Sequence, residues 1–245
     1  MLSIKKRPYS YAMIHYKIQP AAMAEEIKFL RFEDWVRHMF DHEASEPKWY
    51  FEPEAPVWIG PPDLNVEYIT RLFEDPVSVL SKYSDKQLNQ GFWFLVSNGA
   101  SDCMFALMEE SIPIEKRLRC VKSFVSVFEK IFAARCSPHL SHLDEPGASP
   151  INLACYMWWD IIPFGGNPNT PSGNLLNVAA LSVMTETLNI ESIACQESAL
   201  HGLGHWHAAY PAEVESIIDR FLSSHRELRP ETVNYAKSAR CGCVQ

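Results

Sequence analysis

The segment 195–207 (CQESALHGLGHWH) holds the residues whose types and spacing come closest to a chemical site. Glu197, His201 and His205 follow one another at intervals of four, so on one helix they fall within about 80° of arc. A carboxylate and two imidazoles on one helix face can converge on a divalent metal ion. We therefore predict Glu197, His201 and His205 as candidate metal ligands. His207 lies about 200° around the helix from His205, so these two cannot bind one ion unless the helix ends between them.

A purely structural interpretation of the same segment stays open. Gly202 and Gly204 lack side chains, which would let a neighbouring helix approach closely, while the histidines bond its free carbonyl groups. The sequence has neither an HExxH motif nor paired Glu-x-x-His motifs on two helices, so the di-iron pattern of helical bundles is absent. The sequence by itself does not decide between a metal site and helix packing.

A second group of polar residues, SPHLSHLDEP, supplies candidate ligands from outside the helix. His139 and His142 have a spacing that can chelate a metal, and Asp144 and Glu145 follow them. A solvated polar connection is the more usual explanation of such a segment.

Near the last residue, Cys241 and Cys243 flank a single glycine. Two thiols at this spacing can bind a metal or form a disulfide, but they lack the four ligands of a structural zinc site. Because terminal residues are often disordered, we interpret this segment as a mobile tail.

No other motif of enzyme chemistry is present. The stretch 164–174 (FGGNPNTPSGN) has glycines but no lysine, so it does not match a phosphate-binding loop. There is no Gly-x-Ser-x-Gly elbow, and no cysteine has a local nucleophile signature. These absences favour a protein without enzymatic activity, and we expect no cofactor, with a divalent metal as the open alternative.

Charge narrows the class of partner. The 245 residues contain 22 basic and 30 acidic side chains, a net charge of −8. Four bases and no acid lie in the first twenty residues, which leaves a net charge of −12 on the rest of the chain. An acidic surface repels phosphate backbones and anionic membranes, so nucleic-acid and membrane partners are disfavoured. A basic protein remains compatible because an acidic surface attracts it.

Compartment and solubility follow from the same composition. No segment approaches the roughly 18 uninterrupted apolar residues of a membrane-spanning helix, and no apolar stretch typical of a signal peptide follows the first basic residues. The seven cysteines are odd in number and mostly lie within helical patterns, where free thiols behave as small hydrophobic groups. We expect a cytoplasmic protein.

From residue 63 onward, residues typical of helix starts and helix ends recur along the chain. Ser84 with Gln87 fits a capping box, and Pro113 opens the clearest amphipathic helix, which extends to residue 132. The stretch 164–174 is predicted as a loop. Residues 175–188, apolar on nearly every side, are predicted as a helix buried between its neighbours. Three more helices begin near Asn189, Pro211 and Pro230.

The first 62 residues differ from this pattern. Residues 9–18 alternate as a strand does, without a convincing partner to pair with, and a helical pattern follows residue 20. Five prolines among aromatic residues then make 46–62 an extended connection. We predict that 1–62 forms an extended segment, a helix and this connection packed on an α-helical domain of residues 63–245, together one compact domain.

About ten helices joined by short links predict an all-α fold of antiparallel helix pairs stacked side by side. Some pairs recur near 40 residues apart, as from Pro113 to Pro150. In this spacing, residues 63–240 resemble HEAT- or armadillo-like helical-repeat proteins, without a diagnostic repeat motif. An irregular helical bundle is the alternative architecture.

We predict a protein that binds a protein partner through its acidic surface, because stacked helix pairs offer broad faces for recognition. One concrete form is an immunity-like protein that neutralises a basic partner. The alternative is a metal-dependent oxygenase or hydrolase that uses Glu197, His201 and His205. A third hypothesis is a homo-oligomer in which the strand-like segment 9–18 pairs between subunits.

Overall fold

The computed structural model describes residues 25–163, 171–225 and 227–244, and these are largely helical. The predicted all-α class is therefore confirmed. The predicted strand at 9–18 lies outside the described residues. The α-helices are α1 (Phe32–Phe40), α2 (Pro62–Glu74), α3 (Pro76–Leu80), α4 (Asp85–Val96), α5 (Ile114–Val127), α6 (Ala133–Arg135), α7 (Asn152–Tyr156), α8 (Trp158–Ile161), α9 (Pro171–Leu188), α10 (Ile193–Trp206), α11 (Pro211–Ser224) and α12 (Pro230–Arg240).

Shorter elements connect these helices. Three are 3₁₀ turns, η1 (Trp49–Phe51), η2 (Cys103–Met108) and η4 (Ser141–Leu143). A π-helical turn, η3 (Phe128–Phe132), continues α5, so the single helix predicted up to residue 132 changes its winding near its end. Two short strands, β1 (Glu26–Ile27) and β2 (Val57–Trp58), pair in parallel with Glu26 opposite Val57. This pairing was not expected from the sequence, and it ties the start of the described chain to the connection at 46–62.

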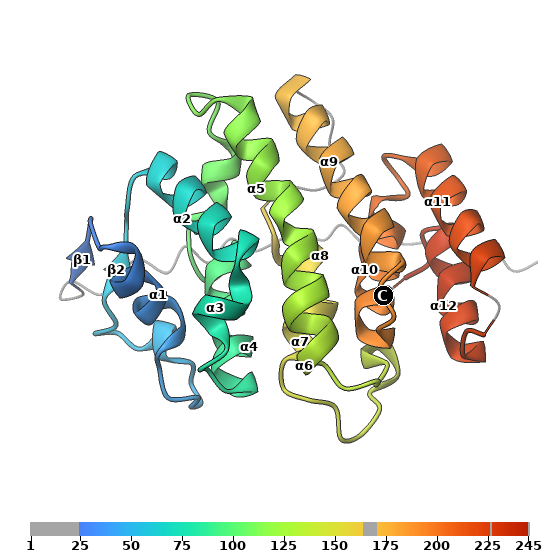
Figure 1. Ribbon diagram of the computed structural model, residues 1–245, viewed down its shortest axis with the longest axis horizontal. Coiled ribbons are helices and arrows are strands. Elements are labelled where there is room, and N and C mark those ends of the chain that lie inside the picture. The colour runs from blue at the N-terminus through green and yellow to red at the C-terminus, as the bar shows by residue number, and fades with distance from the viewer. Residues whose placement is uncertain (1–24, 164–170, 226, 245) are drawn as a thin grey trace, which may run out of the picture.

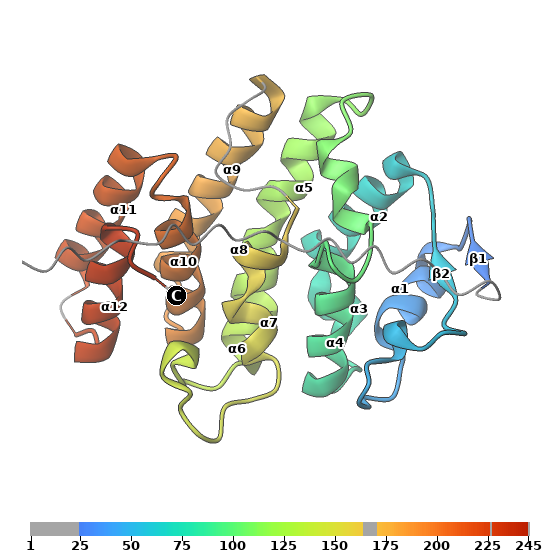
Figure 2. The ribbon, with the colours of Figure 1, turned by 180° about the vertical axis from the view of Figure 1, so that it is seen from behind.

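The helices stand side by side across the long axis of the molecule (Figures 1 and 2). In one row α5 contacts both α2 and α9, and in a second row α4 contacts α7, α7 contacts α10 and α10 contacts α12. Consecutive helices α9 and α10 form an antiparallel pair across the rows, and α11 pairs with α12 at the far end. Because α10 contacts α7, α8, α9, α11 and α12, it is enclosed on most sides.

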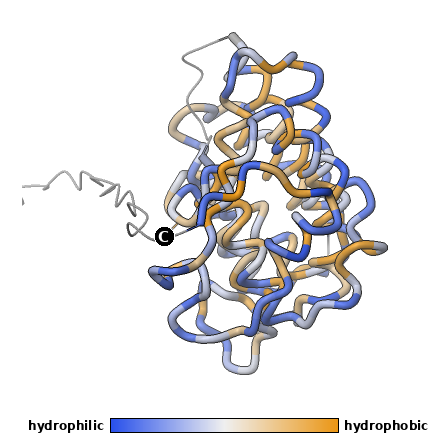
Figure 3. The backbone as a smooth tube through the Cα atoms, turned by 90° about the vertical axis from the view of Figure 1, so that its left-hand side faces the viewer, coloured by the Kyte–Doolittle hydropathy of each residue, from blue (hydrophilic) through white to orange (hydrophobic). Residues whose placement is uncertain are grey.

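The core is rich in aromatic side chains. Fully buried Trp158 lies within 6 Å of five phenylalanine ring centroids, those of Phe73, Phe92, Phe124, Phe128 and Phe132. Buried apolar residues form one cluster from Phe32 to Ala239. Seen along the row of helices, hydrophobic and hydrophilic residues are interspersed along the chain (Figure 3), as expected for helices with one buried stripe.

Two local predictions fared differently. Ser84 caps α4 through a full capping box with Gln87, as the sequence indicated. Of the loop predicted at 164–174, residues 164–170 lie outside the described residues, and the rest is helical, because α9 already begins at Pro171, in the first helical turn where proline is tolerated. Helix α9 is also less enclosed than its composition implies, since Leu175 and Val178 are about half exposed, at 48% and 54%.

The packing role predicted for the glycines of α10 is confirmed. A Cβ atom on Gly202 would lie 2.6 Å from Cγ of Trp159 in α8, and one on Gly204 would lie 2.6 Å from the Val244 side chain. Such distances are far inside van der Waals contact, so these positions allow neighbouring segments to approach α10.

We expect Gly202→Ala to destabilise the protein by roughly 1–2 kcal/mol. Overpacking against a rigid core costs about 1–3 kcal/mol, and the Trp159 ring, stacked on Phe128, has no room to move. The better helix propensity of alanine offsets up to about 1 kcal/mol of this cost. Urea unfolding of Gly202→Ala measures the difference. Gly99→Ala is the control, because an added Cβ there meets only Ser97 Oγ at 3.6 Å; equal stability of both variants would contradict the prediction.

A partly buried histidine in α1 makes stability dependent on pH. His38 packs edge-on against Trp49 and Phe94, and burial, together with the neighbouring His42, lowers its pKa from 6.5 to about 4. The unfolded chain therefore takes up a proton between pH 6.5 and 4 that the folded chain excludes. We expect the stability that comes from the neutral His38 ring to be fully present above pH 6.5. As the pH falls toward 4, the free energy of unfolding should decrease by roughly 2–3 kcal/mol.

The comparison of wild-type protein with His38→Gln tests this expectation. The glutamine variant should lose less stability between pH 6.5 and 4 than the wild type, as measured by urea unfolding at each pH. The control is His225→Gln, at a partly exposed position after α11. Identical pH profiles for wild type and His38→Gln would show that His38 does not carry the effect.

Candidate metal centre

Helix α10 carries the residues singled out in the sequence. The Ser192 side chain accepts a bond from the Cys195 backbone N–H and caps the helix. Most of α10 is buried, so the polar side chains on its inner face have to find partners within the protein. Glu197 is completely buried, His201 is 1% exposed and His205 is exposed. The three predicted ligands therefore lie in different environments.

His201 and His205 converge on Asp160 of α8. His201 Nε2 lies 2.8 Å from Asp160 Oδ2, and His205 Nε2 lies 3.4 Å from Asp160 Oδ1. One ligand atom from each of the three residues fits within 4.8 Å of the other two. The Asp160 and His205 side chains are 22% and 40% exposed, so the site opens to solvent on one side.

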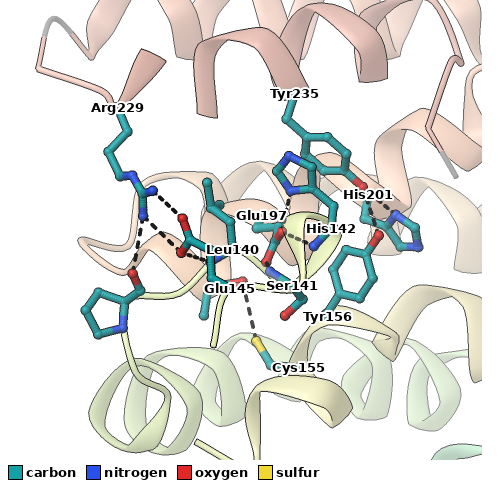
Figure 4. A network of polar contacts seen from close by, with 12 residues as sticks. Leu140, Ser141, His142, Glu145, Cys155, Tyr156, Glu197, His201, Arg229 and Tyr235 are labelled. Atoms are coloured by element: carbon teal, nitrogen blue, oxygen red, sulfur yellow. Dashed lines mark hydrogen bonds and ion pairs between the residues drawn. The ribbon is translucent and has the colours of Figure 1, made fainter. Parts of the chain in front are cut away.

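Glu197, in contrast, is placed elsewhere. Its carboxylate accepts the backbone N–H groups of Ser141 and His142, at 2.8 and 2.9 Å, and the Nδ1–H of His142 at 2.6 Å. These bonds hold the first turn of η4 against α10 (Figure 4). The expectation that Glu197 joins His201 and His205 considered only the angle around the helix. Eight residues also separate Glu197 from His205 by about 12 Å along the axis, too far for one ion.

Asp160 takes the place that the sequence assigned to Glu197. It lies 41 residues before His201, so no helical spacing connects them. One signal was available, since Asp160 is the sole charged residue between positions 150 and 162, a segment otherwise suited to the core. A carboxylate in such a segment needs a partner. The identity of that partner depends on how α8 and α10 pack.

Aromatic side chains of α7 and α12 hold the inner edge of the site. His201 Nδ1 lies 2.7 Å from the Tyr235 hydroxyl, which lies 3.3 Å from the Tyr156 hydroxyl. The His142 ring stacks on Tyr235 with centroids 3.9 Å apart. Tyr235 therefore contacts both His142, which bonds to Glu197, and His201, which bonds to Asp160; Figure 4 shows Tyr235 with His142 and His201. Since Asp160 accepts from Nε2, we assign the His201 proton to Nε2, with Tyr235 donating to Nδ1.

Burial shapes the electrostatics here. The partial burial of the His205 ring lowers its pKa, against the opposing charge of Asp160, and therefore favours the neutral ring that a metal requires. Burial also raises the pKa of Tyr235 and of Tyr156, so both hydroxyls remain protonated and can donate.

The polar segment 137–145 has a structural role in this geometry. His139 Nδ1 bonds to Ser137 Oγ, and His142 is held by Glu197. Glu145 pairs with Arg229 and accepts the Leu140 N–H; these contacts lower its pKa to about 2. Asp144 has a left-handed φ of 50° in the turn after η4. The structure does not bring these side chains to Asp160.

His207 follows the last residue of α10, and its Nε2 lies 3.5 Å from Glu215 in α11. It therefore points away from the group formed by Asp160, His201 and His205, as the angle around the helix predicts.

In the described part of the chain, no helix combines the length and the apolar character needed to cross a membrane. No protein-family model matches the chain, and neither a curated protein nor a solved structure is significantly similar to it. The resemblance to helical-repeat proteins therefore stays a prediction from helix spacing.

Proposed function

We propose that this protein binds a divalent transition metal through Asp160, His201 and His205. The observation that carries the proposal is the convergence of one carboxylate and two imidazoles from α8 and α10 within 4.8 Å. Two histidines and one carboxylate form a set that binds zinc and non-haem iron, with positions left open for water or substrate. The exposed sides of Asp160 and His205 lie where such a position would open.

Small movements would bring the three ligand atoms to one ion. At metal–ligand distances of about 2.0–2.2 Å, tetrahedral ligands lie roughly 3.3 Å apart. His205 Nε2 lies 3.4 Å from Asp160 Oδ1, close to this value, whereas His201 Nε2 lies 2.8 Å from the other carboxylate oxygen, Oδ2. With one ligand atom from each residue, the three atoms lie within 4.8 Å of one another, so the more distant atoms have to approach by up to about 1.5 Å. The ion would replace the proton that His201 and Asp160 share.

The surrounding hydrogen bonds can adapt to that exchange. With a metal on Nε2, the neutral His201 ring carries its proton on Nδ1 and donates it to the Tyr235 oxygen. Tyr235 can then donate to Tyr156, because each hydroxyl both donates and accepts. Ligand histidines are typically oriented by a bond from the other ring nitrogen, and Tyr235 supplies it here.

Metal titration of the purified chain tests the proposal. Protein without a polyhistidine tag is treated with a chelator and titrated with Zn²⁺, Fe²⁺ or Mn²⁺ under anaerobic conditions, using calorimetry and elemental analysis. Since thiols also bind zinc, the titration is repeated with Cys241 and Cys243 both changed to serine. We expect one saturable site per chain in both proteins. Absence of saturable binding for all three metals would refute the proposal.

We also propose a partner for the acidic surface, namely a basic protein. The supporting observation is that most arginines in the described part of the chain are engaged within the molecule. Seven arginines lie in ion pairs with carboxylates: Arg31, Arg37, Arg71, Arg119, Arg135, Arg229 and Arg240. The chain has more acids than bases, so unneutralised carboxylates remain to attract a cationic partner.

A binding measurement at two ionic strengths tests the second proposal. The immobilised chain should retain a basic protein at low salt and release it as salt rises. A variant with Glu52, Glu54 and Glu67, all exposed, changed to glutamine should retain less. Retention that is absent, or that does not respond to salt, would contradict an electrostatic partner.

A further inference from the structure

The segment after α12 brings two exposed thiols together. The Sγ atoms of Cys241 and Cys243 lie 2.9 Å apart, compared with about 2.05 Å in a disulfide. Both residues are exposed, and both thiols are free. Little movement separates this dithiol from the bonded state.

A helix cap produces this arrangement, rather than the mobile tail that the sequence indicated. The Gly242 N–H donates to the Ala239 carbonyl at 3.0 Å, and the Cys243 N–H donates to the Ser238 carbonyl at 2.8 Å. Together these bonds make a Schellman motif, which needs a left-handed residue, and Gly242 supplies it with a φ of 68°. The reversal of direction at Gly242 places the side chains of 241 and 243 next to each other.

The cap is anchored to the body of the protein. Val244 is partly buried and lies over Gly204 of α10, while Gly242 lies against the His207 ring. Contacts on both sides of Cys243 therefore hold the dithiol in place.

The other cysteines are far less available. Four of them, Cys103, Cys120, Cys155 and Cys195, are buried, and Cys136 is partly buried. Burial raises the pKa of Cys103 and of Cys120 to about 12, so these two remain thiols at neutral pH. Because exchange needs an accessible thiolate, the chain directs this chemistry to its C-terminal dithiol.

We propose that Cys241 and Cys243 form a thiol–disulfide exchange site whose substrate is a low-molecular-weight disulfide such as oxidised glutathione. One cysteine thiolate attacks a sulfur of the substrate, forms a mixed disulfide and releases one glutathione. The second thiolate attacks the protein sulfur of the mixed disulfide, closes the Cys241–Cys243 bond and releases the second glutathione. The protein loses two electrons and two protons, and the substrate gains them.

The two thiols interact directly, because the Cys241 thiol hydrogen-bonds to the Cys243 sulfur at 2.9 Å. Either sulfur can make the first attack, and the other then closes the ring. This site is independent of the metal centre, since it uses none of its residues.

The sequence allows a direct test on the full chain. Trypsin cleaves after Arg240 and releases residues 241–245, a peptide with both exposed thiols and no other cysteine. The folded protein is equilibrated in mixtures of reduced and oxidised glutathione, alkylated at low pH, digested and analysed by mass spectrometry. We expect a peptide two hydrogen atoms lighter and free of alkylation in the oxidising mixtures, and full alkylation in the reducing ones.

Variants separate this result from its alternatives. Cys243→Ser should keep a glutathione on Cys241, because the ring cannot close, and Cys136→Ser should behave as the wild type. Two outcomes would overturn the proposal: alkylation of both thiols in every mixture, or two glutathiones on one peptide without ring closure. Protection that persists under reducing conditions and disappears with a chelator would also overturn it, since a bound soft metal would then explain the dithiol.

Discussion

Asp160→Asn and His205→Ala are each expected to weaken Zn²⁺ binding by at least about 100-fold, since loss of an outer-shell partner alone costs about 10–100-fold. Asparagine keeps the shape of Asp160 but removes its charge, and alanine removes the exposed imidazole. His201 is less suitable for substitution because it is buried and bonded at both ring nitrogens. Calorimetric titration of chelator-treated protein measures both affinities.

A control histidine makes this result specific. His225 lies after α11 and bonds to its own helix end, so His225→Ala should leave zinc affinity unchanged. If Asp160→Asn and His205→Ala bind zinc as tightly as His225→Ala does, the convergence of these side chains is a hydrogen-bonded contact between helices and not a metal site. Circular dichroism of each variant confirms that the helices remain folded.

Glu197→Gln is expected to lower the free energy of unfolding by roughly 3 kcal/mol, because removing one partner from a buried charged contact costs about 3–5 kcal/mol. Three donors meet the carboxylate from the segment 141–142. The glutamine keeps one acceptor oxygen and turns an NH₂ group toward the remaining donors, so at least one buried donor loses its partner. Urea unfolding measures the loss.

The same variant separates the two roles that the sequence left open for Glu197. Under conditions where it is folded, Glu197→Gln should bind zinc as the wild type does. The control for stability is Glu186→Gln on the exposed face of α9, which should unfold within about 0.5 kcal/mol of the wild type. Undiminished stability with loss of zinc binding would instead make Glu197 a metal ligand.

Local signals in the sequence account for much of the fold. Helix periodicity and caps predicted the all-α class, and the capping box of Ser84 and Gln87 is present as expected. The glycines of α10 predicted close approach of neighbouring segments, which Gly202 against Trp159 confirms. Such signals act over a few residues, so the one-dimensional pattern contains them.

Local sequence patterns did not predict the parts of the fold that depend on contacts between segments far apart in the sequence. The strands β1 and β2 are two residues each and pair across about 30 positions of sequence. For residues 241–243 the sequence predicted a mobile tail because they lie near the end of the chain, whereas a left-handed Gly242 caps α12 there. Helix α9 begins at Pro171, although the surrounding residues are typical of a loop.

The sequence by itself determined that His201 and His205 share a face of one helix and that His207 does not, because the angle between residues follows from 3.6 residues per turn. Only the tertiary structure decided that Asp160 joins them, that Glu197 instead holds the 141–142 backbone, and that Tyr235 orients His201. The physical reason is that a ligand set requires distances near 3 Å between side chains from different helices. Those distances depend on how α7, α8, α10 and α12 pack, which helical periodicity does not specify.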